Sequence, residues 1–166
     1  MFLRYGLYHR AIEFAQALRT PMAPIARHLT ERVMHLQSNV LSAQMKRKAI
    51  VAGPYVTDQT DPVAMGWSLL HQMVVAQTFT LGKEETALDL RREMMEAMLT
   101  VDSTAEIPQW LRMLPREEGV PRIWHHCETL CRLLLQFHQP QRALQYLKET
   151  ADYANVFFLL FLIRPL

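Results

Sequence analysis

Apolar residues recur at three- and four-residue spacing along most of the chain, which is the spacing that places them on one face of an α-helix. The segment 121–154 carries two such stripes, separated by Gln139-Pro140. Proline lacks an amide donor and fixes φ, so it favours the first turn of a new helix over the middle of an old one. The pattern therefore predicts two helices with a short link, which must pack antiparallel.

The residues predicted to face inward in this pair are apolar and follow the helical period. In the first helix they are Ile123, Cys127, Leu130, Cys131, Leu134 and Phe137. In the second helix they are Ala143, Leu144, Leu147, Ala151 and Ala154. We therefore expect Leu134 and Leu147 to lie opposite each other in a packed core, and Lys148 to face water.

The start of the chain is similar to this helix pair. Residues 2–18 align without a gap with residues 134–150, so that Arg10-Ala11-Ile12 matches Arg142-Ala143-Leu144. Gly6 matches His138, at the position where a left-handed residue would end the preceding helix. Repeated helix pairs of this kind are typical of stacked helical hairpins, which favours a scaffold over a catalyst.

The rest of the chain shows the same helical period between polar or proline-containing breaks. The expected helices are 7–18, 20–48, 63–81, 84–101 and a short one that starts at 107–111 and ends before Pro115, with breaks at 53–61, Gly82 and 102–105. No segment alternates as a strand would. We therefore predict an all-α fold, an irregular α-solenoid of antiparallel helical hairpins. A single domain is expected over residues 1–155, followed by an apolar tail, 156–166, whose role stays open.

Composition narrows the possible functions. The chain has 166 residues, five glycines against ten methionines, and a net charge of +2. So small a charge favours neither direct nucleic-acid binding nor an anionic membrane surface. The apolar run in the tail has eight residues, and a bilayer crossing needs about 20, so no transmembrane segment is expected. The first residues lack the apolar core and cleavage site of a signal peptide.

Candidate chemistry is sparse. The sequence contains neither a glycine-rich phosphate loop nor a GxSxG nucleophile elbow. Cys127 and Cys131 share a helix face, as metal ligands can, but His125 and His126 are expected to point away from it. The two cysteines are therefore interpreted as small buried hydrophobic residues in a reducing compartment. We expect no catalytic residue, no metal and no cofactor.

Other groups have ordinary structural explanations. His28 and His35 are interpreted as surface histidines, since no carboxylate is spaced to orient either. The basic triplet 46–48 is interpreted as a solvated helix end rather than a nucleic-acid patch. The methionines of segment 93–99 could form an adaptable groove, although they are more often core residues.

Five segments, in order, resemble the C-terminal helical region of the large Y-complex scaffold nucleoporin, the 160-kDa nucleoporin family. They are residues 2–18, 20–37, 66–74, 107–114 and 133–154. The resemblance is sharpest at 107–114, where a proline-x-tryptophan-leucine step enters a short helix. The tail from Val156 matches nothing in the family's final helix, and the family's β-propeller is absent. The resemblance therefore implies a piece of a longer nucleoporin.

By this resemblance, the chain is a non-enzymatic structural component of the outer ring of the nuclear pore complex, at the nuclear envelope. Its partners would be other Y-complex solenoid nucleoporins, with no small-molecule substrate. The expected interface residues are Phe137, Tyr146 and Tyr153, although each could instead belong to the core. Two alternatives stay open: a solenoid adaptor of a vesicle-coat or tethering complex, and a small helical ligand-binding domain or enzyme.

Overall fold

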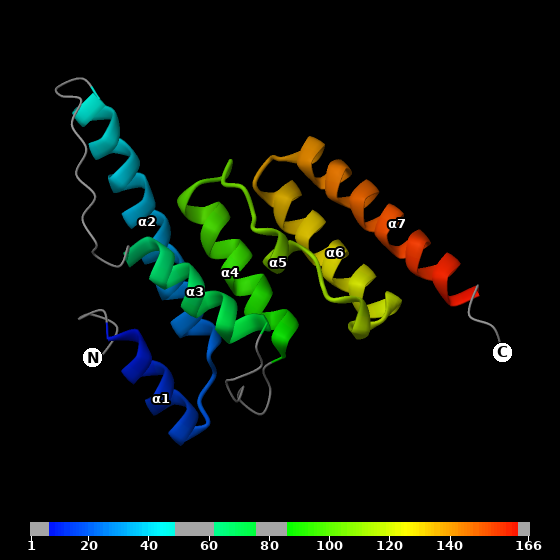
Figure 1. Ribbon diagram of the computed structural model, residues 1–166, viewed down its shortest axis with the longest axis horizontal. Helices are drawn as coiled ribbons and strands as arrows, with labels where there is room; N and C mark the ends of the chain where they lie inside the picture. The colour runs from blue at the N-terminus through cyan, green and yellow to red at the C-terminus, as the bar shows by residue number, and fades with distance from the viewer. Residues whose placement is uncertain (1–6, 49–61, 76–85, 163–166) are drawn as a thin grey trace. The chain divides into compact units, whose positions relative to one another are not determined.

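The computed structural model describes residues 7–48, 62–75 and 86–162, and in these ranges the chain is built from helices alone (Figure 1). The helices are α1 (Tyr8–Leu18), α2 (Ala23–Lys48), α3 (Pro62–Val75), α4 (Ala87–Val101), α5 (Gln109–Arg112), α6 (Val120–Gln136) and α7 (Pro140–Leu162), with a 3₁₀ turn at Arg116–Glu118. No strand occurs in the described ranges. The predicted all-α class is therefore confirmed, whereas the solenoid arrangement stays a prediction.

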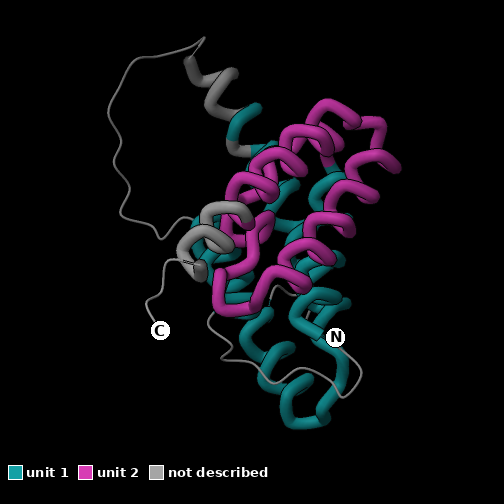
Figure 2. The backbone as a smooth tube through the Cα atoms, turned by 90° about the vertical axis from the view of Figure 1, so that its right-hand side faces the viewer, with its two compact units in different colours: residues 1–101 teal, residues 102–166 magenta. Residues whose placement is uncertain are grey.

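The chain divides into two compact units, unit 1 over residues 1–101 and unit 2 over residues 102–166 (Figure 2). The sequence pattern predicts one domain over 1–155 instead. The division falls at the polar break after α4, where the backbone amide and hydroxyl of Thr104 donate to Asp102 Oδ1 at 2.9 and 2.7 Å. These hydrogen bonds lower the pKa of Asp102, and they close a tight turn that ends the helix.

In unit 1, α2 packs against α1, α3 and α4. Its predicted stripe is confirmed at Met22, Ile25, Leu29 and Val33, all of which are buried. Leu36, on the same stripe, is half-buried. The inward face of α2 is therefore continuous over its first three turns, which makes this helix the centre of the unit.

The packing of α3 on α2 depends on a glycine. Gly66 lies in the middle of α3, and a Cβ built there would overlap with Cγ2 of Val33 on α2. Leu69 and Leu70, on neighbouring sides of α3, are both buried, as are Met73 and Val74. The predicted two-sided apolar character of this helix is therefore confirmed.

The central part of α4 is buried on most sides. Met94, Met95, Met98 and Leu99, predicted to face inward, are each at most 1% exposed. The methionines of this helix are therefore core residues and do not line an open groove. On the outside, Arg27 of α2 donates to Glu93 of α4 at 3.1 Å and contacts Glu31 at 3.4 Å. Ion pairs as exposed as these add at most about 1 kcal/mol.

Unit 2 contains the predicted hairpin of α6 and α7. Cys127 Sγ lies 4.0 Å from the carbonyl of Tyr146, and Cys131 Sγ lies 3.4 Å from that of Ala143. The order of these contacts shows that the two helices run antiparallel. His138, in the link, has a φ of 59°, a left-handed conformation of the kind that commonly ends a helix.

The inward face of α7 differs from the prediction. Over residues 140–154, where side-chain burial is described, Ala143, Tyr146, Thr150 and Ala154 are the buried residues, whereas Leu144 and Leu147 are 54% and 43% exposed. Leu134 is fully buried, so the expected pairing of Leu134 with Leu147 is wrong. The small Ala143 brings the α7 backbone against Cys131, and this contact turns both leucines to one side of the seam. Lys148 is exposed, as predicted.

Several predictions fall outside the described residues, namely those on residues 2–6, the loop 53–61, the helix end at Gly82 and the last residues 163–166. The backbone of the apolar tail is helical as far as Leu162, since α7 continues to that residue. No helix in the described ranges has the combination of length and apolar content that a membrane crossing requires.

Candidate functional site

The cysteine–histidine segment of α6 is divided between the core and the surface. Cys127 and His126 are buried, whereas His125 is exposed. His126 Nε2 lies 2.9 Å from the carbonyl oxygen of Leu111, whereas the thiols of Cys127 and Cys131 lie against carbonyl oxygens of α7. Across the described residues, no group of three or more metal-ligating side chains comes together.

The two thiols lie in the α6–α7 seam, within reach of backbone carbonyl oxygens of α7. Their Sγ atoms lie 4.0 Å apart, and neither cysteine forms a disulfide. Burial, together with the neighbouring Cys127 thiol, raises the pKa of Cys131 to about 12. Because the thiolate is the reactive form of cysteine, this site is poorly suited to nucleophilic chemistry.

We expect Cys131 to react with iodoacetamide far more slowly than free cysteine at pH 8. A pKa raised from the ordinary value of about 8.5 leaves the thiolate fraction small until the pH approaches 12, so the rate should keep rising up to that pH. Mass spectrometry of the alkylated native chain measures this rate, with the urea-unfolded chain as control. A rate that levels off near pH 9 would contradict the assignment.

The three expected interface residues occupy different environments in unit 2. Tyr146 is 5% exposed, so it belongs to the core, as its alternative interpretation allowed. Tyr153 is half-buried, and its hydroxyl donates to the carbonyl of Leu114 at 3.4 Å. Phe137 is half-buried at the C-terminal end of α6. Of the three, only Phe137 and Tyr153 present part of the ring to solvent.

Both tyrosines hold the preceding segment against α7. The Arg112 guanidinium lies 4.7 Å from the ring centre of Tyr146, and the Arg116 guanidinium lies 4.9 Å from that of Tyr153. Arg112 also pairs with Glu149 at 3.5 Å. Each cation–π contact contributes about 0.5–2 kcal/mol, depending on desolvation. The tyrosines therefore stabilise unit 2 from within.

A different set of side chains forms the exposed apolar surface of the hairpin. On α6, Trp124 and Leu135 lie on the same side as Cys131, at spacings of seven and four residues. On α7, Leu144 and Leu147 lie three residues apart. We call Trp124, Leu135, Leu144 and Leu147 the outer apolar face, and their exposed fractions are 38%, 56%, 54% and 43%.

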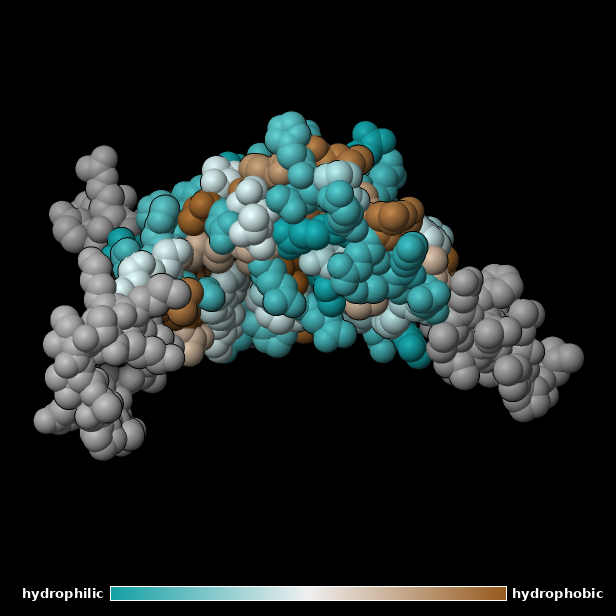
Figure 3. Space-filling model, turned by 90° about the horizontal axis from the view of Figure 1, so that it is seen from above, coloured by the Kyte–Doolittle hydropathy of each residue, from teal (hydrophilic) through white to brown (hydrophobic). Residues whose placement is uncertain are grey.

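The outer apolar face borders the seam between the two helices. Cys131 contacts the backbone of Ala143 across that seam. Leu135 follows Cys131 by one helical turn, and Leu147 follows Ala143 by one turn, so the two helices contribute to one surface. Polar pairs lie beside it, such as Glu128 with Arg132 at 2.6 Å. Figure 3 shows, on the side that it presents, hydrophobic side chains, in brown, among hydrophilic ones.

Grouped exposed apolar side chains are typical of contact surfaces, whereas isolated ones are common on any protein. The sequence contained the signal for this face, because the apolar residues of α7 cover more than one stripe. The positions 143, 144, 146 and 147 cannot all face the same neighbour on a helix.

No protein-family model, curated protein or solved structure matches this chain.

Proposed function

We propose that this chain is a structural scaffold component of the outer ring of the nuclear pore complex, the Y complex. In this role it supports nucleocytoplasmic transport and mRNA export through protein–protein contacts at the nuclear envelope, and it catalyses no reaction. Its partners are other Y-complex solenoid nucleoporins. The observation that carries the proposal is the outer apolar face, together with the resemblance of segments such as 107–114 and 133–154 to that family.

The face has the composition of a helix-binding surface. Three leucines and a tryptophan border a seam between antiparallel helices, and charged pairs lie at its edge. An amphipathic helix can lay its apolar side along such a seam, with Trp124 as the aromatic anchor. Phe137 and Tyr153, with rings partly exposed, are proposed as further contacts. This is how one helical hairpin stacks on the next in helical scaffolds.

The proposal is tested by replacing both leucines of α7 on this face with aspartate, in the chain expressed with its natural flanks. Because Leu144 and Leu147 are exposed, the double variant should fold normally. Burying two carboxylates in the contact should lower recovery of pore-coat proteins by about tenfold or more. Quantitative mass spectrometry after affinity purification measures the recovery, and imaging of a fluorescent fusion measures enrichment at the nuclear rim.

The matched control is Gln145→Asp, which changes an exposed residue of α7 that does not belong to the outer apolar face. It should leave recovery unchanged. The assignment fails if the unaltered chain never enriches at the nuclear rim or with pore-coat proteins. Recovery of vesicle-coat or tethering subunits instead would favour the adaptor alternative.

A further inference from the structure

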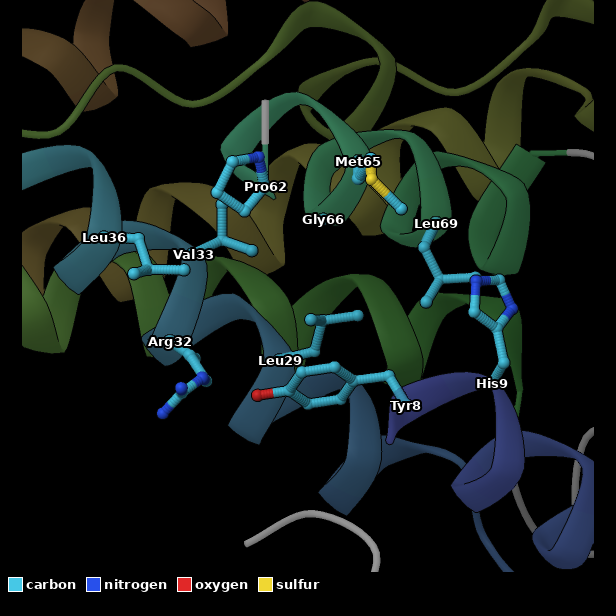
Figure 4. Close-up of a pocket in the computed structure, with 10 residues that line it drawn as sticks. All are labelled: Tyr8, His9, Leu29, Arg32, Val33, Leu36, Pro62, Met65, Gly66 and Leu69. Carbon is cyan, nitrogen blue, oxygen red and sulfur yellow. The ribbon is translucent and has the colours of Figure 1, made fainter. Parts of the chain in front are cut away.

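A cavity of about 360 Å³ opens between α1, α2 and α3 of unit 1 (Figure 4). Its volume lies within the range of about 300–1,000 Å³ that is common for small-molecule sites. The residues that line it are Tyr8, His9, Leu29, Arg32, Val33, Leu36, Pro62, Met65, Gly66 and Leu69. Three helices of one unit therefore form a concave site that is independent of the outer apolar face.

Most of the wall is aliphatic. Leu29, Val33 and Leu36 come from successive turns of α2, and Leu69 and Met65 come from α3. On the α3 side, Gly66 packs closely on Val33, and Met65 is 51% exposed at the mouth of the cavity. Such walls favour a compact hydrocarbon group over a polar one.

Two polar groups, those of Tyr8 and Arg32, lie toward one end of this cavity, whereas His9 lies on the other side (Figure 4). Figure 4 shows the Tyr8 hydroxyl directed toward the side of the cavity where the Arg32 guanidinium lies. The Tyr8 hydroxyl oxygen is buried, yet it has no hydrogen-bond partner among the described residues. A buried hydroxyl without a partner costs free energy, so a ligand atom that accepts a hydrogen bond from it would be stabilised there.

The charge at this end is positive. Arg32 forms no ion pair within the described part of the chain, and no acidic residue is among the ten that line the cavity. Burial raises the pKa of Tyr8 although the Arg32 cation opposes the effect, so the hydroxyl stays protonated and able to donate. A guanidinium and a hydroxyl together match the two oxygens of one carboxylate.

We propose that this cavity binds a small amphipathic monocarboxylate, such as a medium-chain fatty acid. The carboxylate pairs with Arg32 and accepts a hydrogen bond from the Tyr8 hydroxyl, and the hydrocarbon part contacts Leu29, Leu36, Leu69 and Met65. A cation would meet an unfavourable charge here. A phosphate dianion would have only one cation to pair with, and the aliphatic walls would leave most of it poorly solvated.

The probe for this proposal is decanoate, titrated into the full chain by calorimetry. We expect saturable binding with a Kd of about 1 mM or tighter. Decanol has the same hydrocarbon chain without the charge, and it should bind about tenfold more weakly or worse. Decyltrimethylammonium, the cationic counterpart, should not bind at the site.

Two variants each remove one of the polar groups that are proposed to bind the carboxylate. Arg32→Gln should weaken decanoate binding by about tenfold or more, and Tyr8→Phe by about three- to tenfold. Arg32 is exposed, so its replacement should leave the fold intact. The matched control is Arg10→Gln, which removes an exposed arginine of α1 that does not line the cavity and should leave binding unchanged.

The position of bound decanoate is determined by NMR, from the methyl resonances of ¹³C-labelled methionine. Met65 should shift on addition of decanoate, whereas Met113 of unit 2, which does not line the cavity, should not. The proposal is overturned if decanoate shows no saturable binding at millimolar concentration. It is also overturned if decanol binds equally well, if Arg32→Gln binds like the unaltered chain, or if the Met65 resonance does not move.

Discussion

Replacing Leu134 with alanine should lower the free energy of unfolding of unit 2 by about 2–5 kcal/mol. Leu134 is fully buried on the face of α6 that also carries Leu130 and Cys127. The loss combines the transfer free energy of the deleted methyl groups with the cavity left behind, because a hairpin seam closes around a void only in part. Urea unfolding followed by circular dichroism measures the change.

Leu147→Ala is the matched control, since it deletes the same atoms from a leucine that is 43% exposed. It should stay within about 0.5 kcal/mol of the unaltered chain, as exposed substitutions usually do. The contrast tests the observed face of α7 directly. If the two variants lose equal stability, Leu147 lies in the seam after all.

Gly66→Ala should also destabilise the chain, by about 1–3 kcal/mol from overpacking, less about 1 kcal/mol gained in helix propensity. The added methyl group would overlap with Cγ2 of Val33, which is 1% exposed. Val33 is β-branched and has one strongly preferred rotamer in a helix, so it cannot turn aside at low cost. Thermal and urea unfolding of unit 1 would show the loss.

The sign of this effect should reverse in a Val33→Ala background. Without the Val33 methyl groups the new Cβ has room, and Gly66→Ala should then stabilise by up to about 1 kcal/mol through helix propensity. A double-mutant cycle isolates this coupling. An alanine at 66 that destabilises equally in both backgrounds would place the cause elsewhere than the contact with Val33.

The helices could be predicted from the sequence because each carries a periodic stripe bounded by proline, glycine or a polar break. The predicted helix at 7–18 is observed at Tyr8–Leu18, and the one at 20–48 at Ala23–Lys48. The inward face of α7 could not be predicted from hydrophobicity alone. Leu144 and Leu147 are more apolar than Tyr146 and Thr150, yet the tyrosine and threonine are buried.

The candidate sites depended on information that a single sequence lacks. Tyr146 has the same aromatic character in a core as on a surface, and only the packing around it, which leaves it 5% exposed, distinguishes the two. The cavity requires α1, α2 and α3 to be placed together, so that Tyr8 and Arg32, which are far apart in sequence, share one end of it. Local periodicity contains neither relation.

The buried methionines of unit 1 have a consequence for how such a sequence can diverge. Met94, Met95 and Met98 are unbranched and adaptable, so a neighbour can change volume while the methionines adopt new rotamers. Gly66 and Val33 have no such tolerance, because any increase in side-chain volume at one position requires a decrease at the other. Over evolutionary time, the interior of α4 should therefore drift freely, whereas the α2–α3 crossing should change only by paired substitutions.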